Sequence, residues 1–239
     1  MIPKVAVPNY ELIIPSNGKK ITVRPFLVKE EKILLMAVES NNLADIINTT
    51  KQVIKDCIVS EDVNVDTLPY FDIDYLMVAL RAKSIGETID VKFTCKHEID
   101  GKECGNTFKA TIDVSNCTVK KPDVENVIKI GNTHTIKLKY PTYGTMKFIN
   151  DNDSIINKKL NLIAGCIDNI QQKQKVYTAK DVTPKEMGDF LEGLTKADFS
   201  KLENFVDNLP TFVITTQAKC TKCEFVHNIE YTDFESFFV

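Results

Sequence analysis

Two pairs of cysteines, each at the end of a strand pattern, constrain the fold of this chain more than any other feature. Residues 89–94 alternate apolar and polar side chains and run into Cys95, which is followed by Cys104. Residues 212–216 form a second strand pattern ahead of Cys220-Thr221-Lys222-Cys223. A turn between two strands directs a pair of thiolates toward one tetrahedral ion. The sequence therefore predicts a zinc-ribbon-like element in which Cys95, Cys104, Cys220 and Cys223 bind one structural zinc ion.

The wide spacing between Cys95 and Cys104 leaves other interpretations of these thiols open. They could be ordinary buried or surface cysteines, and His97 in the intervening loop could replace one cysteine as a ligand. A redox pair is expected at the start of a helix, whereas strand-like residues 225–231 follow the second pair. Because four thiolates leave no open position for water, we expect the ion to stabilise the fold rather than to catalyse a reaction.

The other three cysteines do not form a pair. Cys57 and Cys166 fall on the apolar stripes of two expected helices, which favours small core side chains over catalytic nucleophiles, and Cys117 also lacks a paired neighbour. A total of seven cysteines would serve a disulfide framework poorly. The first residues contain two prolines and no apolar segment typical of a secretory signal. We therefore expect the chain to act in a reducing cytoplasm.

The composition is that of a folded protein and excludes several classes of function. Hydrophobic residues make up 43% of 239 residues, enough for a sizeable core, but no apolar run approaches the roughly 20 residues that cross a bilayer. The formal net charge of -3 lacks the basic excess of a general nucleic-acid-binding coat. Common phosphate, dinucleotide, hydrolase and metalloprotease signatures are absent. We therefore expect a non-enzymatic protein.

The order of the expected elements indicates an α+β protein of two related halves. The N-terminal half, residues 1–118, contains a β-hairpin around Asn17-Gly18, helices including one over 72–83, and the first cysteine knuckle with its return strand. The C-terminal half, residues 119–239, repeats a hairpin over 127–139, helices including one over 156–170, and the second knuckle. This order suggests a degenerate internal duplication in which the zinc ion would hold the halves together.

The C-terminal segment is rich in phenylalanine. Phe234, Phe237 and Phe238 close the sequence, with few residues after them to cover their rings. Such a segment either packs on its own domain or contacts another protein. These three residues are therefore candidate partner-binding residues.

Both ends of the sequence resemble one protein family. The most specific likeness lies in Arg24-Pro25-Phe26-Leu27-Val28-Lys29-Glu30-Glu31-Lys32, and further likeness lies in Pro8-Asn9-Tyr10-Glu11-Leu12, Pro15-Ser16-Asn17-Gly18, Leu209-Pro210, Cys220-x-x-Cys223 and Phe237-Phe238. In these segments the chain resembles the baseplate hub assembly proteins of T-even-type contractile-tailed bacteriophages. The wide spacing of the first cysteine pair departs from the compact pair expected there.

The resemblance implies a non-enzymatic protein that binds baseplate hub subunits during tail assembly, as a chaperone or scaffold, in the host cytoplasm. The expected partners are phage hub or tail proteins, with no nucleic acid and no membrane. One alternative is a permanent structural component of the virion baseplate. Another is a zinc-ribbon accessory factor that binds nucleic acid, although the lysines near the cysteine pairs are offset by neighbouring acidic residues.

Overall fold

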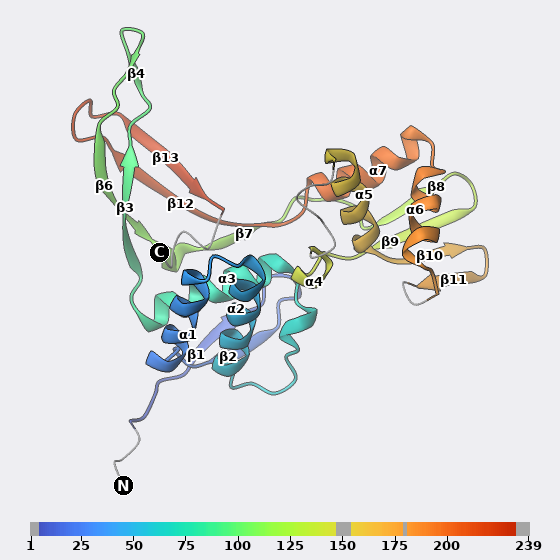
Figure 1. Ribbon diagram of the computed structural model, residues 1–239, viewed down its shortest axis with the longest axis horizontal. Coiled ribbons are helices and arrows are strands. Elements are labelled where there is room, and N and C mark those ends of the chain that lie inside the picture. Colours follow the sequence, from blue (N-terminus) through green and yellow to red (C-terminus); the bar gives the residue numbers. More distant parts are fainter. Residues whose placement is uncertain (1–4, 147–153, 179–180, 233–239) are drawn as a thin grey trace. The chain divides into compact units, whose positions relative to one another are not determined.

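The chain forms two compact units that both mix helices with antiparallel strands. The computed structural model describes residues 5–146, 154–178 and 181–232, and Figure 1 shows the elements in chain order. The first unit comprises residues 1–120 and 211–239, and the second comprises residues 121–210. Among the helices within these described ranges, none has the length and apolar character to cross a membrane. The predicted mixture of helices and strands is confirmed.

The first unit is built around one central helix. Its elements are β1 (Tyr10–Ile13), β2 (Lys20–Val23), α1 (Val28–Glu39), α2 (Leu43–Cys57), η1 (Val65–Thr67), α3 (Tyr70–Ser84), β3 (Thr88–Thr94), β4 (Glu98–Ile99), β5 (Lys102–Glu103), β6 (Thr107–Asp113), η2 (Val114–Asn116), β7 (Thr118–Lys120), β12 (Thr211–Lys219) and β13 (Val226–Tyr231). Residues 71–74 and 76–82 of α3 are buried on every face of the helix. Such a helix needs neighbours all round it, and α2, β7 and β12 all contact α3.

The first hairpin forms as the sequence predicts and is anchored to α3. Strands β1 and β2 pair from Tyr10↔Val23 to Ile13↔Lys20, and Gly18 in the turn has a positive φ of 72°. The helix α3 starts at Tyr70, two residues before the predicted start. Asp72 thus lies in the first turn of α3, and its buried carboxylate accepts the backbone N–H of Ser16 at 2.9 Å, in the hairpin turn.

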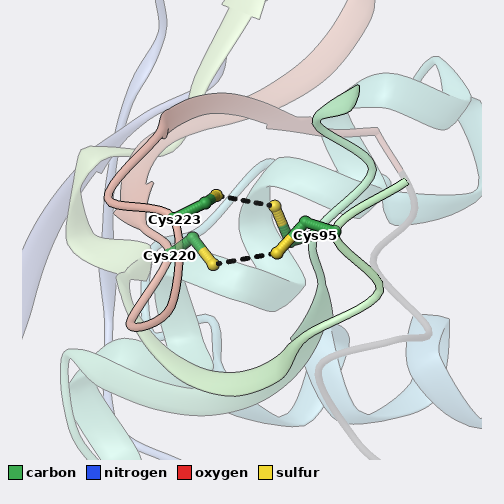
Figure 2. Close-up of side chains that lie close together, drawn as sticks. Cys95, Cys220 and Cys223 are labelled. Atoms are coloured by element: carbon green, nitrogen blue, oxygen red, sulfur yellow. Dashed lines mark hydrogen bonds between the residues drawn. The ribbon is translucent and has the colours of Figure 1, made fainter. Parts of the chain in front are cut away.

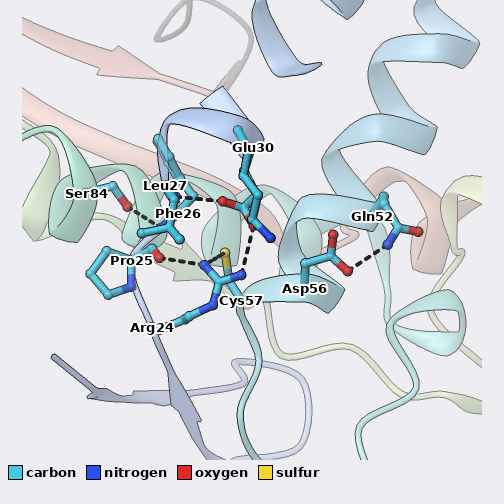
Figure 3. A network of polar contacts seen from close by, with 10 residues as sticks. Arg24, Pro25, Phe26, Leu27, Glu30, Gln52, Asp56, Cys57 and Ser84 are labelled. Atoms are coloured by element: carbon cyan, nitrogen blue, oxygen red, sulfur yellow. Dashed lines mark hydrogen bonds and ion pairs between the residues drawn. The ribbon is translucent and has the colours of Figure 1, made fainter. Parts of the chain in front are cut away.

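A buried ion pair joins the end of β2 to the start of α1 (Figure 3). Arg24 Nη2 lies 2.8 Å from Glu30 Oε1, and the Glu30 side chain is only 2% exposed. The second carboxylate oxygen of Glu30 accepts the backbone N–H of Leu27 at 2.8 Å, which satisfies a free N–H group at the helix start. The backbone N–H of Arg24 donates to the carbonyl of Cys57 at 2.9 Å. The ion pair thus joins the hairpin to α1, and the backbone hydrogen bond joins it to the end of α2.

These contacts decide the protonation of Glu30. Burial raises the pKa of Glu30. The hydrogen bonds from Arg24, the Leu27 N–H and Lys29 together lower it by more than burial raises it, so the pKa lies below its ordinary value of 4.5. A carboxyl group whose pKa is depressed in the folded state stabilises the fold above its unfolded pKa. That contribution is lost as the pH falls through the folded pKa.

The second unit is a four-stranded antiparallel sheet with helices packed on it. Its elements are β8 (Val127–Ile130), β9 (His134–Leu138), α4 (Tyr143–Met146), α5 (Ile155–Cys166), β10 (Ile167–Gln172), β11 (Lys175–Thr178), α6 (Pro184–Glu192) and α7 (Lys196–Asp207). The strand order is β11-β10-β9-β8. The core combines sheet residues such as Ile136 and Leu138 with Ile163 of α5, Leu191 of α6 and Leu202 of α7.

The predicted helix over 156–170 is wrong at its C-terminal end. The helix α5 stops at Cys166, and Ile167 to Gln172 form β10, which pairs with β9 and β11. Ile167 and Ile170 are both buried, at a spacing that fits a helix as well as a strand with an irregular register. The periodicity could not distinguish the two, and pairing with β9 decided in favour of the strand.

Both units contain the same contact at the C-terminal end of one helix, which is α2 in the first unit and α5 in the second. In the first unit Val23 bridges to Ile58 and the Arg24 N–H donates to Cys57 O at 2.9 Å. In the second unit Leu138 pairs with Ile167 and the N–H of Lys139 donates to Cys166 O at 2.8 Å. Cys57-Ile58 and Cys166-Ile167 therefore occupy corresponding positions in the two units. An internal duplication would produce this match, and it stays a prediction.

The two compact units differ from the two predicted halves in where the C-terminal residues belong. The break at Lys120 lies close to the predicted boundary after residue 118, but residues 211–239 belong with the first unit. The reason is that β12 pairs with β7, from Thr211↔Lys120 to Val213↔Thr118, and with β13. All four candidate zinc ligands consequently lie in one unit, so an ion bound there would not join the two units as the sequence analysis expects.

We expect Arg24→Met to lower the free energy of unfolding by about 3 kcal/mol at pH 7, because it leaves the Glu30 carboxylate buried without its partner. The loss should shrink below about pH 4.5, as Glu30 becomes protonated. Urea unfolding at both pH values measures it. The control Lys20→Met breaks an exposed pair with Glu11 and should cost less than about 1 kcal/mol. Equal losses in the two variants would contradict the role of the buried pair.

Candidate metal centre

The structure brings the four predicted cysteines together at one point. The sulfur atoms of Cys95, Cys104, Cys220 and Cys223 all lie within 4.8 Å of one another. Cys95 Sγ is 3.6 Å from Cys223 Sγ, and Cys104 Sγ is 3.9 Å from Cys220 Sγ (Figure 2). Four sulfurs about 2.3 Å from a central zinc ion would be separated by about 3.8 Å. The spacing of the thiols therefore fits a single tetrahedral ion.

The first knuckle, residues 95–106, keeps a compact base despite its length. Strands β4 and β5 form a small hairpin between the two cysteines, and its Asp100-Gly101 turn has φ values of 50° and 76°. The N–H of Cys104 donates to His97 O at 2.8 Å and closes the base of this hairpin. The insertion thus projects away from the thiols, and the wide sequence spacing does not separate them.

Backbone hydrogen bonds close the turn of the first knuckle and so hold Cys95 and Cys104 near each other. The N–H of Cys95 donates to Asn106 O at 2.9 Å, and the N–H of Gly105 donates to Cys95 O at 3.0 Å. Gly105 has a φ of 62°, in the left-handed region that favours glycine. A Cβ at this position would meet no atom nearer than the Glu103 carbonyl oxygen at 4.0 Å. The glycine is therefore required by the backbone conformation and not by crowding.

The second knuckle, residues 220–225, has the same backbone geometry. The N–H of Cys220 donates to Phe225 O at 2.9 Å, and the N–H of Glu224 donates to Cys220 O at 3.0 Å. Glu224 takes the place of the glycine, with a φ of 59°. Its side chain makes an exposed ion pair with Lys219 at 3.5 Å, which contributes little. The two knuckles are thus equivalent turns that face each other.

A small apolar core supports the two knuckles from below. Phe108 and Ala110 of β6 and Ala218 of β12 are buried with Cys95 and Cys220, and half-buried residues of β3 and β13 pack against them. The β3–β6 ladder has only two strands. Ladders of this size are marginal in water without an additional constraint. Bonds from the four thiolates to one ion would supply that constraint.

The acidity of the thiols fits a site that binds a cation. Burial raises the pKa of Cys95, and its proximity to the other cysteines adds to this, so that the pKa reaches about 12. Burial also raises the pKa of Cys220, but hydrogen bonds from the Cys223 and Lys222 N–H groups and from Asn106 outweigh it and lower the pKa to about 6. Without a cation, repulsion keeps the four thiols from ionising together. A soft divalent ion such as Zn²⁺ relieves that repulsion.

The three histidines lie in different surroundings. His97, the alternative ligand, stacks its ring on Phe225 at 4.1 Å and an interplanar angle of 12°. His134 belongs to β9 in the second unit. His227, in β13, has its Nε2 atom 3.1 Å from Cys95 Sγ. The alternation of β13 turns His227 and Ile229 to the same side, and this was the one sequence signal for its position.

The unpaired cysteines are buried in the cores, in agreement with the sequence analysis. Cys57 and Cys166 are fully buried and Cys117 is 8% exposed. Burial raises the pKa of Cys57 to about 11 and the pKa values of Cys117 and Cys166 to about 12. Thiols with such high pKa values are poor nucleophiles at neutral pH. The candidate partner residues Phe234, Phe237 and Phe238 lie outside the described residues.

We expect Cys223→Ala to lower metal content and thermal stability together. The purified wild-type protein should hold about one zinc ion, and the variant almost none, with a thermal midpoint lower by about 5 °C or more. Elemental analysis and thermal unfolding measure the two effects. The control Cys166→Ala changes a core thiol of the second unit and should keep the metal. Unchanged metal stoichiometry in Cys223→Ala would rule out the four-cysteine assignment.

We expect that introducing glycine at position 224 stabilises the fold and that removing glycine from position 105 destabilises it. Glu224→Gly should raise the free energy of unfolding by about 0.5–1 kcal/mol, because glycine adopts the positive φ without strain. Gly105→Ala should lower it by about 1 kcal/mol for the same reason. Chemical denaturation of the metal-loaded proteins tests both. Destabilisation by Glu224→Gly would mean that the Glu224 side chain contributes more than its exposed ion pair indicates.

Comparisons with known proteins agree with the family indicated by the sequence. No curated protein and no solved structure matches this chain. The family described as T4 bacteriophage base plate protein matches residues 7–239, which include both units and all four cysteines of the cluster. With its match extending over nearly the whole sequence, the chain belongs to this T4-type bacteriophage base plate protein family.

Proposed function

We propose that this protein is a non-enzymatic assembly factor of the phage baseplate, which binds hub subunits and holds them until their own contacts form. Membership of the base plate family over residues 7–239 is the observation that carries this proposal. The likeness to hub assembly proteins at both ends of the sequence favours the hub over other parts of the baseplate. The proposed site of action is the host cytoplasm, during tail assembly.

The helix α1 offers a surface suited to binding another protein. Val28, Leu35 and Met36 lie on one side of α1 and are 79%, 49% and 57% exposed. Leu43 at the start of α2 is 57% exposed as well. Apolar side chains exposed along one side of a helix offer a surface that another protein can cover. Part of this face falls within the Arg24–Lys32 segment that carries the most specific family likeness, so we assign hub binding to it.

The proposed zinc ion would have a structural role in this function. Four cysteine ligands fill a tetrahedral ion and leave no position for a substrate or an activated water. The ion would fix the two knuckles, and with them the β3–β6 and β12–β13 hairpins of the first unit. The protein would thereby present a rigid surface to its partners, which lowers the entropic cost of binding.

Nucleic acid is not the partner we propose. Several lysines near the knuckles are offset by acidic residues, and Lys120 and Lys219 form ion pairs with Glu230 and Glu224. A nucleic-acid site needs a basic groove with exposed aromatic rings. The charge balance around the cysteine cluster therefore favours a protein partner.

The test is affinity capture of the tagged full-length protein from infected cells, together with mass spectrometry of purified virions. Capture of hub proteins, with the chain absent from virions, is the expected result for an assembly factor. Capture of hub proteins with the chain present in virions would replace this proposal with that of a permanent baseplate component. Capture without any tail protein, or with salt-sensitive binding of nucleic acid, would overturn both.

A pair of variants locates the binding surface. Met36→Glu places a charge on the exposed face of α1 and should reduce hub capture at least about tenfold, because a charge buried in an apolar interface is costly. Ile155→Glu is the matched control: Ile155 is 87% exposed in the second unit, at the start of α5, where an acidic residue is well tolerated. Equal capture by both variants would place the hub-binding surface elsewhere.

A further inference from the structure

The four cysteines of the cluster differ in their access to water. Cys95 and Cys220 are 0% and 1% exposed, whereas Cys104 and Cys223 are half-buried. A thiolate bound to a divalent ion keeps much of its negative charge and needs hydrogen-bond donors. Water can supply donors to the two half-buried sulfurs. The two buried sulfurs depend on donors from the protein itself.

Each buried sulfur lies within hydrogen-bond distance of a side-chain nitrogen from the opposite knuckle or the residues just after it. Asn106 Nδ2, at the end of the first knuckle, lies 3.5 Å from Cys220 Sγ of the second. His227 Nε2, just after the second knuckle, lies 3.1 Å from Cys95 Sγ of the first. The two contacts cross between the knuckles in opposite directions. They reach the two cysteines that water does not reach.

Neighbouring groups hold both nitrogen atoms in place. Asn106 Nδ2 also donates to Thr221 Oγ1 at 3.0 Å, which fixes the orientation of its amide. The ring of His227 lies against Phe93 at 5.0 Å and against Phe225 at 4.8 Å between centroids. His227 pairs with Ala218 in the β12–β13 ladder, and this register fixes the position of His227 along the strand, next to the cluster. A thiolate has no proton to donate, so the proton of this contact must lie on His227 Nε2.

We propose that Asn106 and His227 are reciprocal N–H donors to the two buried metal ligands, and that they lock the two knuckles together around the ion. This inference rests on the proposed metal centre and assigns it two positioning residues. The donors lower the charge on Cys220 and Cys95 without displacing them from the ion. Loss of such an outer hydrogen bond weakens metal affinity about 10–100-fold.

Cobalt substitution of the full-length protein tests the proposal. His227→Phe keeps an aromatic ring between its neighbours but removes the donor, and Asn106→Leu removes the other. Each should weaken cobalt binding about tenfold or more and shift the thiolate-to-cobalt charge-transfer band to lower energy. His227→Gln, whose amide can donate to the sulfur, should restore the band. The control His97→Phe keeps the stack on Phe225 and should match the wild type.

The outcomes separate this inference from the proposed metal centre. Wild-type protein that binds no cobalt and no zinc would overturn the metal centre and the inference together. Wild-type protein that binds one ion, with an unchanged spectrum and affinity in His227→Phe and Asn106→Leu, would overturn the inference alone. If a variant fails to fold, NMR of the cadmium-loaded wild type decides. Scalar coupling from cadmium to the His227 and Asn106 N–H protons supports the donors, and its absence excludes them.

Discussion

The cysteine-bearing region of the first unit depends on the meeting of two knuckles whose sulfur atoms lie within 4.8 Å of one another. The apolar core beneath them is small, and the β3–β6 ladder has only two strands, so packing by itself gives this region little stability. The knuckles are nevertheless built alike, with equivalent backbone hydrogen bonds and a positive φ at Gly105 and at Glu224. One ion bound by all four thiolates would supply the constraint that this small core lacks.

Away from the cluster, stability comes from ordinary packing reinforced at a few polar points. In the first unit the buried Arg24–Glu30 pair ties β2 to α1, and Asp72 ties the hairpin turn to α3. In the second unit, helices pack on a four-stranded sheet around residues such as Ile136 and Leu202. In both units the residues at the end of a helix, Cys57-Ile58 and Cys166-Ile167, pair with the second strand of the hairpin in the same way.

We propose that the protein acts by binding rather than by catalysis, and two features of the structure underlie this proposal. The cluster brings four cysteine thiols together, and the thiols in the cores have pKa values of about 11 to 12, raised by burial. The exposed apolar residues Val28, Leu35 and Met36 lie on one side of α1, in a unit that the metal would make rigid. The chain belongs to the base plate family, and a hub subunit is the partner that we propose for this surface.

The sequence by itself determined the hairpins, most of the helices and the four cysteine positions, because alternation, helical periodicity and paired thiols are local patterns. It placed the helix end in the second unit too late, since Ile167 and Ile170 fit both a helix and a strand. It also could not place β12 and β13 with residues 1–120, or bring His227 to Cys95. Only the tertiary structure decided these points, because strand pairing between residues about a hundred positions apart depends on which surfaces become buried together.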